Sequence, residues 1–291
     1  MILTLENEFL RVALNTFGGA IESMVNKRTG TDHYWHYDPA VWPRRTAICF
    51  PICSALRGGV FTHHGRTYTL PMHGFLRERN LGIISCGQQY AVMEFVSDAA
   101  TRSCYPFDFR FELEQRLEEN TLVVIYRVSN PGKEPLPFSI GSHYTYALPA
   151  APQCCRYRFS APQSAPSLVL NGGVVQGKGS DVFGGASELP MNISPGASSR
   201  IFETADLSTD YIAIGTGAGD FTRVRYRDFP YTVLWHPAGP DSPFACIEAW
   251  AGMADYEGSS GEITEKKGIQ TAFPGETKTF IQRITAMETI H

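Results

Sequence analysis

The segment RFELEQRLEENTLVVIYRVSNPG, residues 110–132, begins with apolar and polar residues that alternate with a period of two over residues 110–114. At its start, Phe111 and Leu113 point to one side and the neighbouring charged residues point to the other, which is the pattern of a half-buried β-strand. Glu-Glu-Asn at 118–120 is typical of a turn, and the run 122–128 that follows is rich in β-branched residues. Asn-Pro-Gly then ends the segment, so the sequence predicts an antiparallel hairpin here.

Strand-like segments recur along the chain of 291 residues, and Gly or Pro separates nearly all of them. The further segments are Ile2–Leu5, Leu10–Leu14, Ala91–Val96, Tyr211–Ile214, Thr232–Trp235, Ala245–Glu248 and Lys278–Ile284. No stretch long enough for a typical helix carries an apolar stripe of helical period. Short strands at this spacing favour an antiparallel sandwich or barrel. We therefore expect one all-β domain over residues 1–291, in which the Gly- and Pro-rich region 150–195 forms long loops.

The charge balance and the composition exclude several classes of protein. With 25 Lys+Arg against 29 Asp+Glu, the net charge is −4, which together with the lack of a basic stripe argues against nucleic acid as a partner. The N-terminal residues MILTLENE do not resemble a signal peptide, and no apolar run is long enough to span a membrane. Seven cysteines, an odd number, make a poor disulfide framework. We therefore expect reduced thiols in a cytoplasmic protein that has no membrane partner.

The common catalytic signatures are missing from the sequence. There is no Walker A motif, no Gly-x-Ser-x-Gly elbow and no His-Glu-x-x-His pair, and the glycines at 215–219 lack the spacing of the dinucleotide fingerprint. His33 and His36 form one potential metal-binding pair, and His63 and His64 form another. No matching set of Cys or carboxylate residues accompanies either pair in the sequence. The sequence therefore predicts no metal site.

Three other segments combine apolar residues with isolated polar ones. They are LPMHGFLR at 70–77, FSIGSHY at 138–144 and FACIEAW at 244–250. In the last two, a single titratable residue, His143 or Glu248, lies in or next to an apolar strand-like run. Burying such a group without a partner costs several kcal/mol, so each must be partnered in the core or line a cleft. From the residues alone, a satisfied core or edge residue is the more common interpretation of each.

Taken together, the segments resemble the aldose 1-epimerase (galactose mutarotase-like) superfamily, and most closely its bacterial LacX-type subgroup. The similar motifs, in chain order, are WPRRTAICFPI at 42–52, YTLPMHGFLR at 68–77, YPFDF at 105–109, IGSH at 140–143, IEAW at 247–250, EKKGI at 265–269 and FPGE at 273–276. Each motif is short, but their shared order over most of the chain makes the resemblance specific.

The resemblance implies a single large antiparallel β-sandwich with a sugar site in a cleft on one sheet. It also implies an isomerase that interconverts the α and β anomers of an aldose by general acid–base ring opening, for which no cofactor is needed. By position in the motifs, Glu248 is expected to be the base and His143 the acid. His73 is expected to bind the sugar and to help hold charge on the ring oxygen. A carboxylate and an imidazole suit this proton transfer near neutral pH.

Other expected sugar contacts are arginine and tryptophan side chains. The resemblance places Arg44 and Arg77 at subgroup positions, but Ala55 stands where the family usually has an arginine. Arg57 lies two residues further on, and positions two apart in a strand face the same side, so Arg57 is expected to substitute for it. Trp235 is expected to give the sugar an apolar platform, although packing in the core is the alternative for such aromatics.

Several alternatives remain open from the sequence. The cluster of Arg44, Arg45, Arg57 and Arg77 suits a phosphorylated or sulfonated sugar, because arginine forks match these anions. A non-catalytic carbohydrate-binding or regulatory protein on the same fold is a second alternative, since a fold does not imply a function. A metal-dependent hydrolase or lyase is a third. In each case, the expected partner is a small molecule, and the expected assembly is a monomer or a homodimer.

Overall fold

The predicted hairpin lies within a large antiparallel sheet. The computed structural model describes residues 1–43, 48–191, 199–237, 239 and 241–287. β9 (Arg110–Glu118) and β10 (Thr121–Ser129) pair along their whole length, which confirms the hairpin. The sheet has nine strands in the order β17 (Glu188–Pro190), β14 (Arg156–Phe159), β19 (Ile212–Thr216), β20 (Gly219–Tyr226), β24 (Thr277–Ala286), β10, β9, β8 (Tyr90–Val96) and β7 (Gly82–Cys86).

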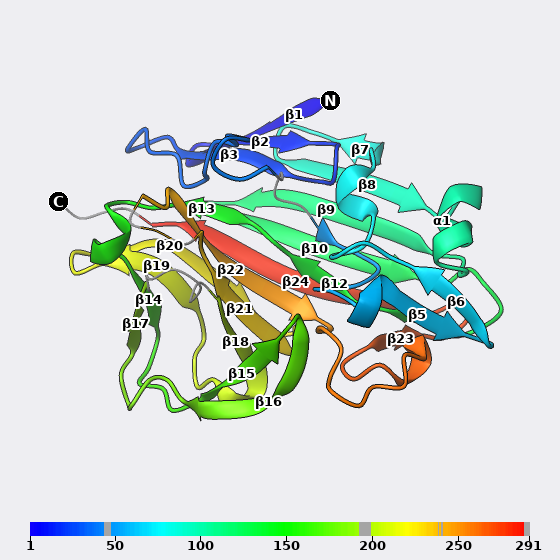
Figure 1. Cartoon of the computed structure of the whole chain (residues 1–291). Coiled ribbons are helices and arrows are strands. Elements are labelled where there is room, and N and C mark those ends of the chain that lie inside the picture. The colour runs from blue at the N-terminus through cyan, green and yellow to red at the C-terminus, as the bar shows by residue number, and fades with distance from the viewer. Residues whose placement is uncertain (44–47, 192–198, 238, 240, 288–291) are drawn as a thin grey trace.

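A second antiparallel sheet of six strands packs against the first (Figure 1). Its order is β18 (Ser199–Glu203), β21 (Tyr231–Trp235), β22 (Phe244–Ala251), β12 (Ile140–Ser142) and β4 (Ile48–Cys49), with β13 (Thr145–Ala147) also paired to β22. Smaller pieces surround the two sheets: the sheet β1 (Ile2–Glu6), β2 (Leu10–Asn15) and β3 (Ile21–Asn26), and the pairs β5 (Val60–His63) with β6 (Arg66–Thr69), β11 (Leu136–Phe138) with β23 (Gln270–Ala272), and β15 (Pro166–Asn171) with β16 (Val174–Asp181).

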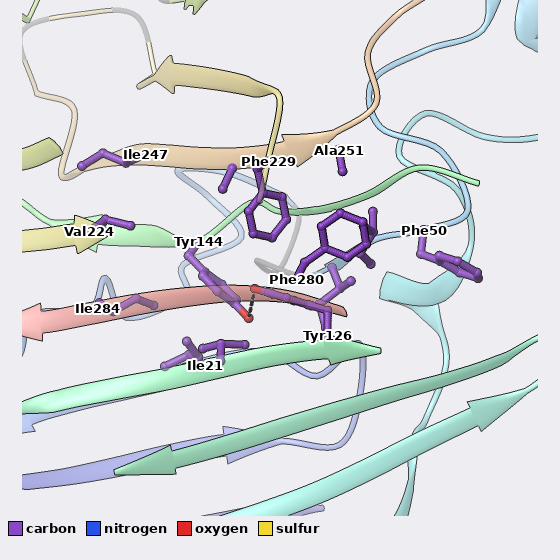
Figure 2. Close-up of a cluster of buried hydrophobic side chains, with 14 of the residues drawn as sticks. Ile21, Phe50, Tyr126, Tyr144, Val224, Phe229, Ile247, Ala251, Phe280 and Ile284 are labelled. Carbon is purple, nitrogen blue, oxygen red and sulfur yellow. Dashed lines mark hydrogen bonds between the residues drawn. The ribbon is translucent and has the colours of Figure 1, made fainter. Parts of the chain in front are cut away.

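The main hydrophobic core fills the space between the two large sheets (Figure 2). The ring of Phe229, in the turn before β21, lies 5.9 Å from that of Tyr126 of β10 and 5.4 Å from that of Phe280 of β24. The hydroxyls of Tyr126 and Tyr144 lie 3.1 Å apart in a hydrogen bond, so these buried polar groups are satisfied inside the core. The expected fold class, a single-domain all-β sandwich, is confirmed.

All the segments expected as strands overlap strands of the structure, but the expectation for residues 150–195 was wrong. Four short strands, β14 to β17, lie in the described part of this region. The β15–β16 pair contains register shifts, and Leu168 and Val175 are its buried residues. A bulged pair with so few buried positions shows no regular alternation of apolar and polar residues. The Gly- and Pro-rich composition therefore pointed to loops.

Helical structure is minor in the described part of the chain. Its α-helix is α1 (Ala99–Cys104), alongside short 3₁₀ turns such as η1 (Arg57–Gly59), η2 (Leu76–Glu78) and η5 (Ile263–Glu265). None of the described helices has the length and apolar character that crossing a bilayer requires. All seven cysteines are free thiols, as expected.

The strand β22 is buried along its whole length, so both of its faces are covered. Ala245, Ile247 and Ala249 belong to the core between the sheets. Because side chains alternate along a strand, Glu248 and Trp250 face the opposite side of the six-stranded sheet. This outer side carries a second, smaller apolar cluster that includes Trp250.

Gly74 occupies a position that only glycine fits, which leads to a stability prediction. Its φ is +70°, and a Cβ there would lie 2.2 Å from the backbone oxygen of Phe50. Gly65 has a similar φ of +72° with nothing near its Cβ position, so it serves as a matched control. We expect Gly65→Ala to lower the free energy of unfolding by about 1–2 kcal/mol, the cost of the left-handed backbone alone.

Gly74→Ala is expected to cost about 3 kcal/mol or more, because the clash with Phe50 adds to the backbone strain. Urea unfolding midpoints of the two variants, at unchanged m-value, measure the difference. Equal losses in the two variants would show that the close approach to Phe50 is unimportant.

Candidate active site

A cavity of about 340 Å³ lies on the outer side of the six-stranded sheet. Its size is within the range of small-molecule sites. Strands β18, β21 and β22, the residue that follows β12, and the segment around His73 contribute to it. The described residues that line it are Trp42, Ser54, Met72, His73, Arg77, His143, Leu170, Ser199, Ile201, Val233, Trp235, Glu248 and Trp250.

His73 reaches the cavity from the loop after β6, and its ring is fixed in one tautomer. The backbone N–H of Ser54 donates to Nδ1 of His73 at 3.1 Å, and the Cys49 Sγ lies 3.2 Å from the same nitrogen. A nitrogen that accepts a hydrogen bond carries no proton, so the neutral ring has its proton on Nε2. His73 is 8% exposed. It therefore offers the cavity a single N–H donor in a defined position.

His143 follows β12 directly, and aromatic rings hold its imidazole. The ring stacks on Trp42 at a centroid distance of 5.0 Å and contacts Trp235 edge-to-face at 5.6 Å. Its other neighbour is His73, 5.4 Å away and nearly perpendicular. Burial lowers the pKa of His143 well below its ordinary value, because the apolar surroundings disfavour the imidazolium.

Gly141 of β12 allows this placement of His143. The strand pairs with β22 so that Gly141 lies opposite Trp250, and a Cβ on Gly141 would lie 2.4 Å from the Trp250 ring. The indole Nε1 of Trp250 donates to the backbone oxygen of Ser142 at 3.2 Å, which fixes the ring over the glycine. The glycine of the IGSH motif thus lets a large aromatic side chain form the floor beside His143.

Glu248 projects from the middle of β22 into the cavity and is 1% exposed. Its Oε2 lies 3.7 Å from Nε2 of His143 and accepts no hydrogen bond from the described part of the chain. Burial raises the pKa of Glu248 well above its ordinary value, since the carboxylate loses its hydration. Perturbed groups that meet in a cavity are the hallmark of acid–base sites.

Burial favours the uncharged form of both Glu248 and His143, because it raises the pKa of the carboxyl and lowers the pKa of the imidazole. A neutral carboxylic acid beside a neutral imidazole carries the same total number of protons as a carboxylate beside an imidazolium. The two arrangements differ only in which group holds the titratable proton. The 3.7 Å between Nε2 and Oε2 is longer than a hydrogen bond, so a proton passes between the two groups only through a hydroxyl or water placed between them. Such a pair can take a proton from one oxygen of a bound molecule and give a proton to another.

The remaining walls combine aromatic, apolar and cationic side chains. Trp42 and Trp235 lie 5.4 Å apart and flank His143, and both line the cavity. Apolar contacts come from Leu170 at the tip of β15 and from Met72, which is largely exposed. The Arg77 side chain of η2 is mostly buried and faces the same cavity. Flat aromatic faces next to hydrogen-bonding groups suit a ligand with both apolar and hydroxyl surfaces.

The structure brings most of the predicted site residues together. His73, His143, Glu248, Arg77 and Trp235 all line the cavity. Their roles remain predictions. Arg44 lies outside the described residues, as does its neighbour Arg45.

Arg57, predicted to be a sugar ligand, does not line the cavity. Its backbone N–H donates to Asp255 at 2.7 Å, and its guanidinium donates to the backbone oxygen of Ser259 at 2.8 Å. The prediction assumed that residues 55 and 57 belong to one strand. They do not, because Arg57 begins the 3₁₀ turn η1, in which side chains two apart do not share a face.

Trp42, Cys49 and Cys246 are among the groups at the cavity that were not predicted from the sequence. Trp42 opens the WPRR motif, and its position there was the available signal for its stacking on His143. Cys49 and Cys246 lie behind His73 and His143, with Sγ to Nδ1 distances of 3.2 and 3.7 Å. Nothing in the sequence marks these two buried thiols, because a buried cysteine usually behaves as a small apolar residue.

Comparisons with known proteins agree on one family. The family model described as "Aldose 1-epimerase" matches residues 1–285. The chain is also similar to the chromosomal protein LacX of Lactococcus lactis subsp. lactis, with 23% identity over 290 residues that cover 95% of this chain and 96% of LacX.

Solved structures share the fold. A galactose mutarotase related enzyme from Lactobacillus acidophilus superposes with a TM-score of 0.92 at 24% identity, covering 99% of this chain and 98% of that one. A galactose mutarotase-like protein from Lactobacillus casei gives a TM-score of 0.90 at 21% identity, covering 99% and 100% of the two chains. At these identities, the likeness concerns the architecture.

Proposed function

The chain belongs to the aldose 1-epimerase family, and from this premise we propose that it is an isomerase that interconverts the α and β anomers of an aldose. The observation that carries the proposal is the meeting of three groups in one cavity. The Glu248 carboxyl lies 3.7 Å from the His143 imidazole, whose ring centroid is 5.4 Å from that of His73. A cyclic hemiacetal has two oxygens on one carbon, the C1 hydroxyl and the ring oxygen. Glu248 and His143 provide one proton acceptor and one proton donor for these two oxygens.

Ring opening starts from the charged form of the pair, in which the proton has moved from Glu248 to His143. With the shared proton on His143, the Glu248 carboxylate accepts the proton of the C1 hydroxyl and the His143 imidazolium donates to the ring oxygen. The bond between C1 and the ring oxygen breaks, and an aldehyde forms at C1. Rotation about C1–C2 and closure in the reverse sense give the other anomer. No electrons leave the sugar, so this reaction needs no cofactor.

His73 contributes a fixed hydrogen bond to this reaction. Nδ1 accepts a hydrogen bond from the N–H of Ser54, so the proton of the neutral ring is on Nε2 and can be donated to a sugar oxygen. In a water-poor cavity, a donor held in advance stabilises charge that develops on a sugar oxygen. We assign His73 to binding and charge stabilisation, with Trp235 and Arg77 as further substrate contacts.

A phosphorylated or sulfonated aldose is the second candidate substrate, and Arg77 favours it. Its guanidinium stays protonated across the physiological pH range and lines the cavity. A planar fork of donors suits a phosphate or sulfonate group.

Exchange between anomers, followed by NMR on neutral aldoses and their 6-phosphates, tests the proposal. We expect the protein to raise the exchange rate of at least one sugar above the rate in buffer. For a charged substrate, KM should rise with salt, because screening weakens its attraction to Arg77. A neutral substrate should show little salt dependence. Saturable binding of a sugar without faster exchange would show a binding protein and refute the proposed activity.

A further inference from the structure

A group of polar side chains outside the sugar cavity has no part in the proposed reaction. It lies where the hairpin of β5 and β6 meets the loop after β10 and the segment before η5. Its members are His63, His64, Glu134 and Glu262, none of which lines the cavity. The sequence shows only the two adjacent histidines, since Glu262 lies 199 residues away from His63.

The two imidazoles and Glu134 converge on a common point. Nε2 of His64 lies 3.5 Å from Oε2 of Glu134, and Nε2 of His63 lies 3.9 Å from the same oxygen. One ligand atom from each of the three residues lies within 4.8 Å of the others. With bonds of about 2.0–2.1 Å, two ligands on a tetrahedral Zn²⁺ ion are separated by about 3.4 Å. The spacing of these atoms is therefore close to that of a metal site.

His63 has the features of a metal ligand rather than those of a surface residue. It is 8% exposed, and its Nε2 is buried without a hydrogen-bond partner in the described part of the chain. Its Nδ1 lies 3.2 Å from Oε1 of Glu262, which accepts a hydrogen bond from this nitrogen. A carboxylate on Nδ1 orients the ring and leaves the lone pair of Nε2 available, as is usual for histidine ligands of zinc.

Glu262 is itself held in place. The hydroxyl of Thr264 donates to its Oε1 at 3.3 Å, and the hydroxyl of Thr62 donates to its Oε2 at 3.4 Å. The backbone N–H of Thr62 also donates to the oxygen of Gly261 at 2.7 Å, which joins the hairpin to this segment. The ring of His63 is thus positioned before any ion binds.

We propose that His63, His64 and Glu134 bind a divalent transition metal ion of the zinc type, with Glu262 as the positioning residue of His63. Two imidazoles and a carboxylate leave a fourth coordination position for water. The ion would tie the β5–β6 hairpin to the loop after β10. The alternative is that these side chains hold no ion and join the hairpin to its neighbours through hydrogen bonds alone.

His33 and His36, the other sequence pair, do not meet in this way. His33 is buried with Nδ1 3.1 Å from the hydroxyl of Thr222, whereas His36 is exposed and pairs with Asp32 at 3.3 Å. The His36 pair resembles many surface His–Asp contacts. The variant His36→Ala is therefore a matched control for non-specific binding by an exposed histidine.

Titration of the metal-free full chain with Co²⁺ and Zn²⁺ tests the proposal. We expect one Co²⁺ per chain with the intense visible bands of four-coordinate cobalt, and displacement of cobalt by Zn²⁺. His64→Ala and Glu134→Ala should each weaken binding at least tenfold, and Glu262→Gln should weaken it about 10–100-fold at unchanged stoichiometry. His36→Ala should bind like the wild type. His64 and Glu134 are exposed, so their variants are expected to fold.

A second group of potential ligands, His143, Cys246 and Glu248, requires a separate control. Binding there would give a cobalt–thiolate charge-transfer band and would be lost in Glu248→Gln. The proposed site predicts no such band and full binding by Glu248→Gln. The proposal would be overturned if the wild type bound cobalt no more tightly than His64→Ala, or if His36→Ala weakened binding as much as His64→Ala does. These outcomes do not depend on the proposed isomerase activity.

Discussion

Glu248→Gln is expected to lower kcat for anomer exchange by about 10²–10⁴-fold, the usual contribution of a general acid–base group. The amide has nearly the same shape as the carboxyl but cannot accept the proton of the C1 hydroxyl. NMR exchange rates at saturating sugar, with the rate in buffer subtracted, measure the loss. Glu8→Gln, an exposed carboxyl in the N-terminal sheet region, is the control and should keep the wild-type rate. A wild-type rate in Glu248→Gln would refute its assignment as the base.

The same variant should be more stable than the wild type at neutral pH. Above pH about 4.5 the unfolded chain ionises this carboxyl, while in the folded chain burial raises its pKa, so it ionises only at higher pH. The folded state then binds more protons, so the free energy of unfolding falls as pH rises toward the folded pKa. Glu248→Gln removes this loss, so its free energy of unfolding at neutral pH should be higher than that of the wild type, by about 1.4 kcal/mol for each unit by which folding raises the pKa. Urea unfolding across this pH range would show two curves that diverge with pH.

His143→Gln is expected to lower kcat by a similar factor of about 10²–10⁴, because it removes the donor to the ring oxygen. The wild-type profile of kcat/KM against pH should be bell-shaped, with both limbs belonging to the Glu248–His143 pair. The variant should lose the two-limbed profile as well as the rate. His36→Gln, which changes an exposed imidazole, should alter neither.

Equal profiles for the wild type and His143→Gln would contradict the role of this imidazole as the acid. A role that is merely structural would lower the rate and leave the shape of the profile unchanged. The effects of Glu248→Gln and His143→Gln on kcat should not add, because residues that act as one unit have non-additive effects. The double variant should therefore be little slower than either single variant.

The strands could be predicted from the sequence wherever one side of a strand meets solvent. β9 alternates buried and half-buried residues without a break, so its period is visible in the sequence. β22 is buried at every position, so burial does not distinguish its two faces. Glu248 is the charged residue that marks its outer face. The sequence could therefore identify β22 as a strand, but it could not tell which way the Glu248 carboxyl points.

The meeting of the site residues depends on pairings between distant segments. Gly141 lies opposite Trp250, and this register of β12 and β22 brings His143 to Glu248. Local alternation carries no information about such partners, so the site was predictable only through the motif resemblance. Arg57 shows the limit of motif counting, because a local 3₁₀ turn replaced the assumed strand and turned the guanidinium toward Ser259.

The walls of the cavity differ in how firmly the fold constrains them, and this governs how the protein can evolve. Glu248 belongs to a strand buried on both faces, so changes around it disturb the whole sandwich. Leu170 and Met72 lie at exposed edges of the same cavity, where substitutions disturb little else. New sugar preferences can therefore arise at the rim while the chemistry below it is inherited unchanged. A library for directed evolution belongs at these rim positions.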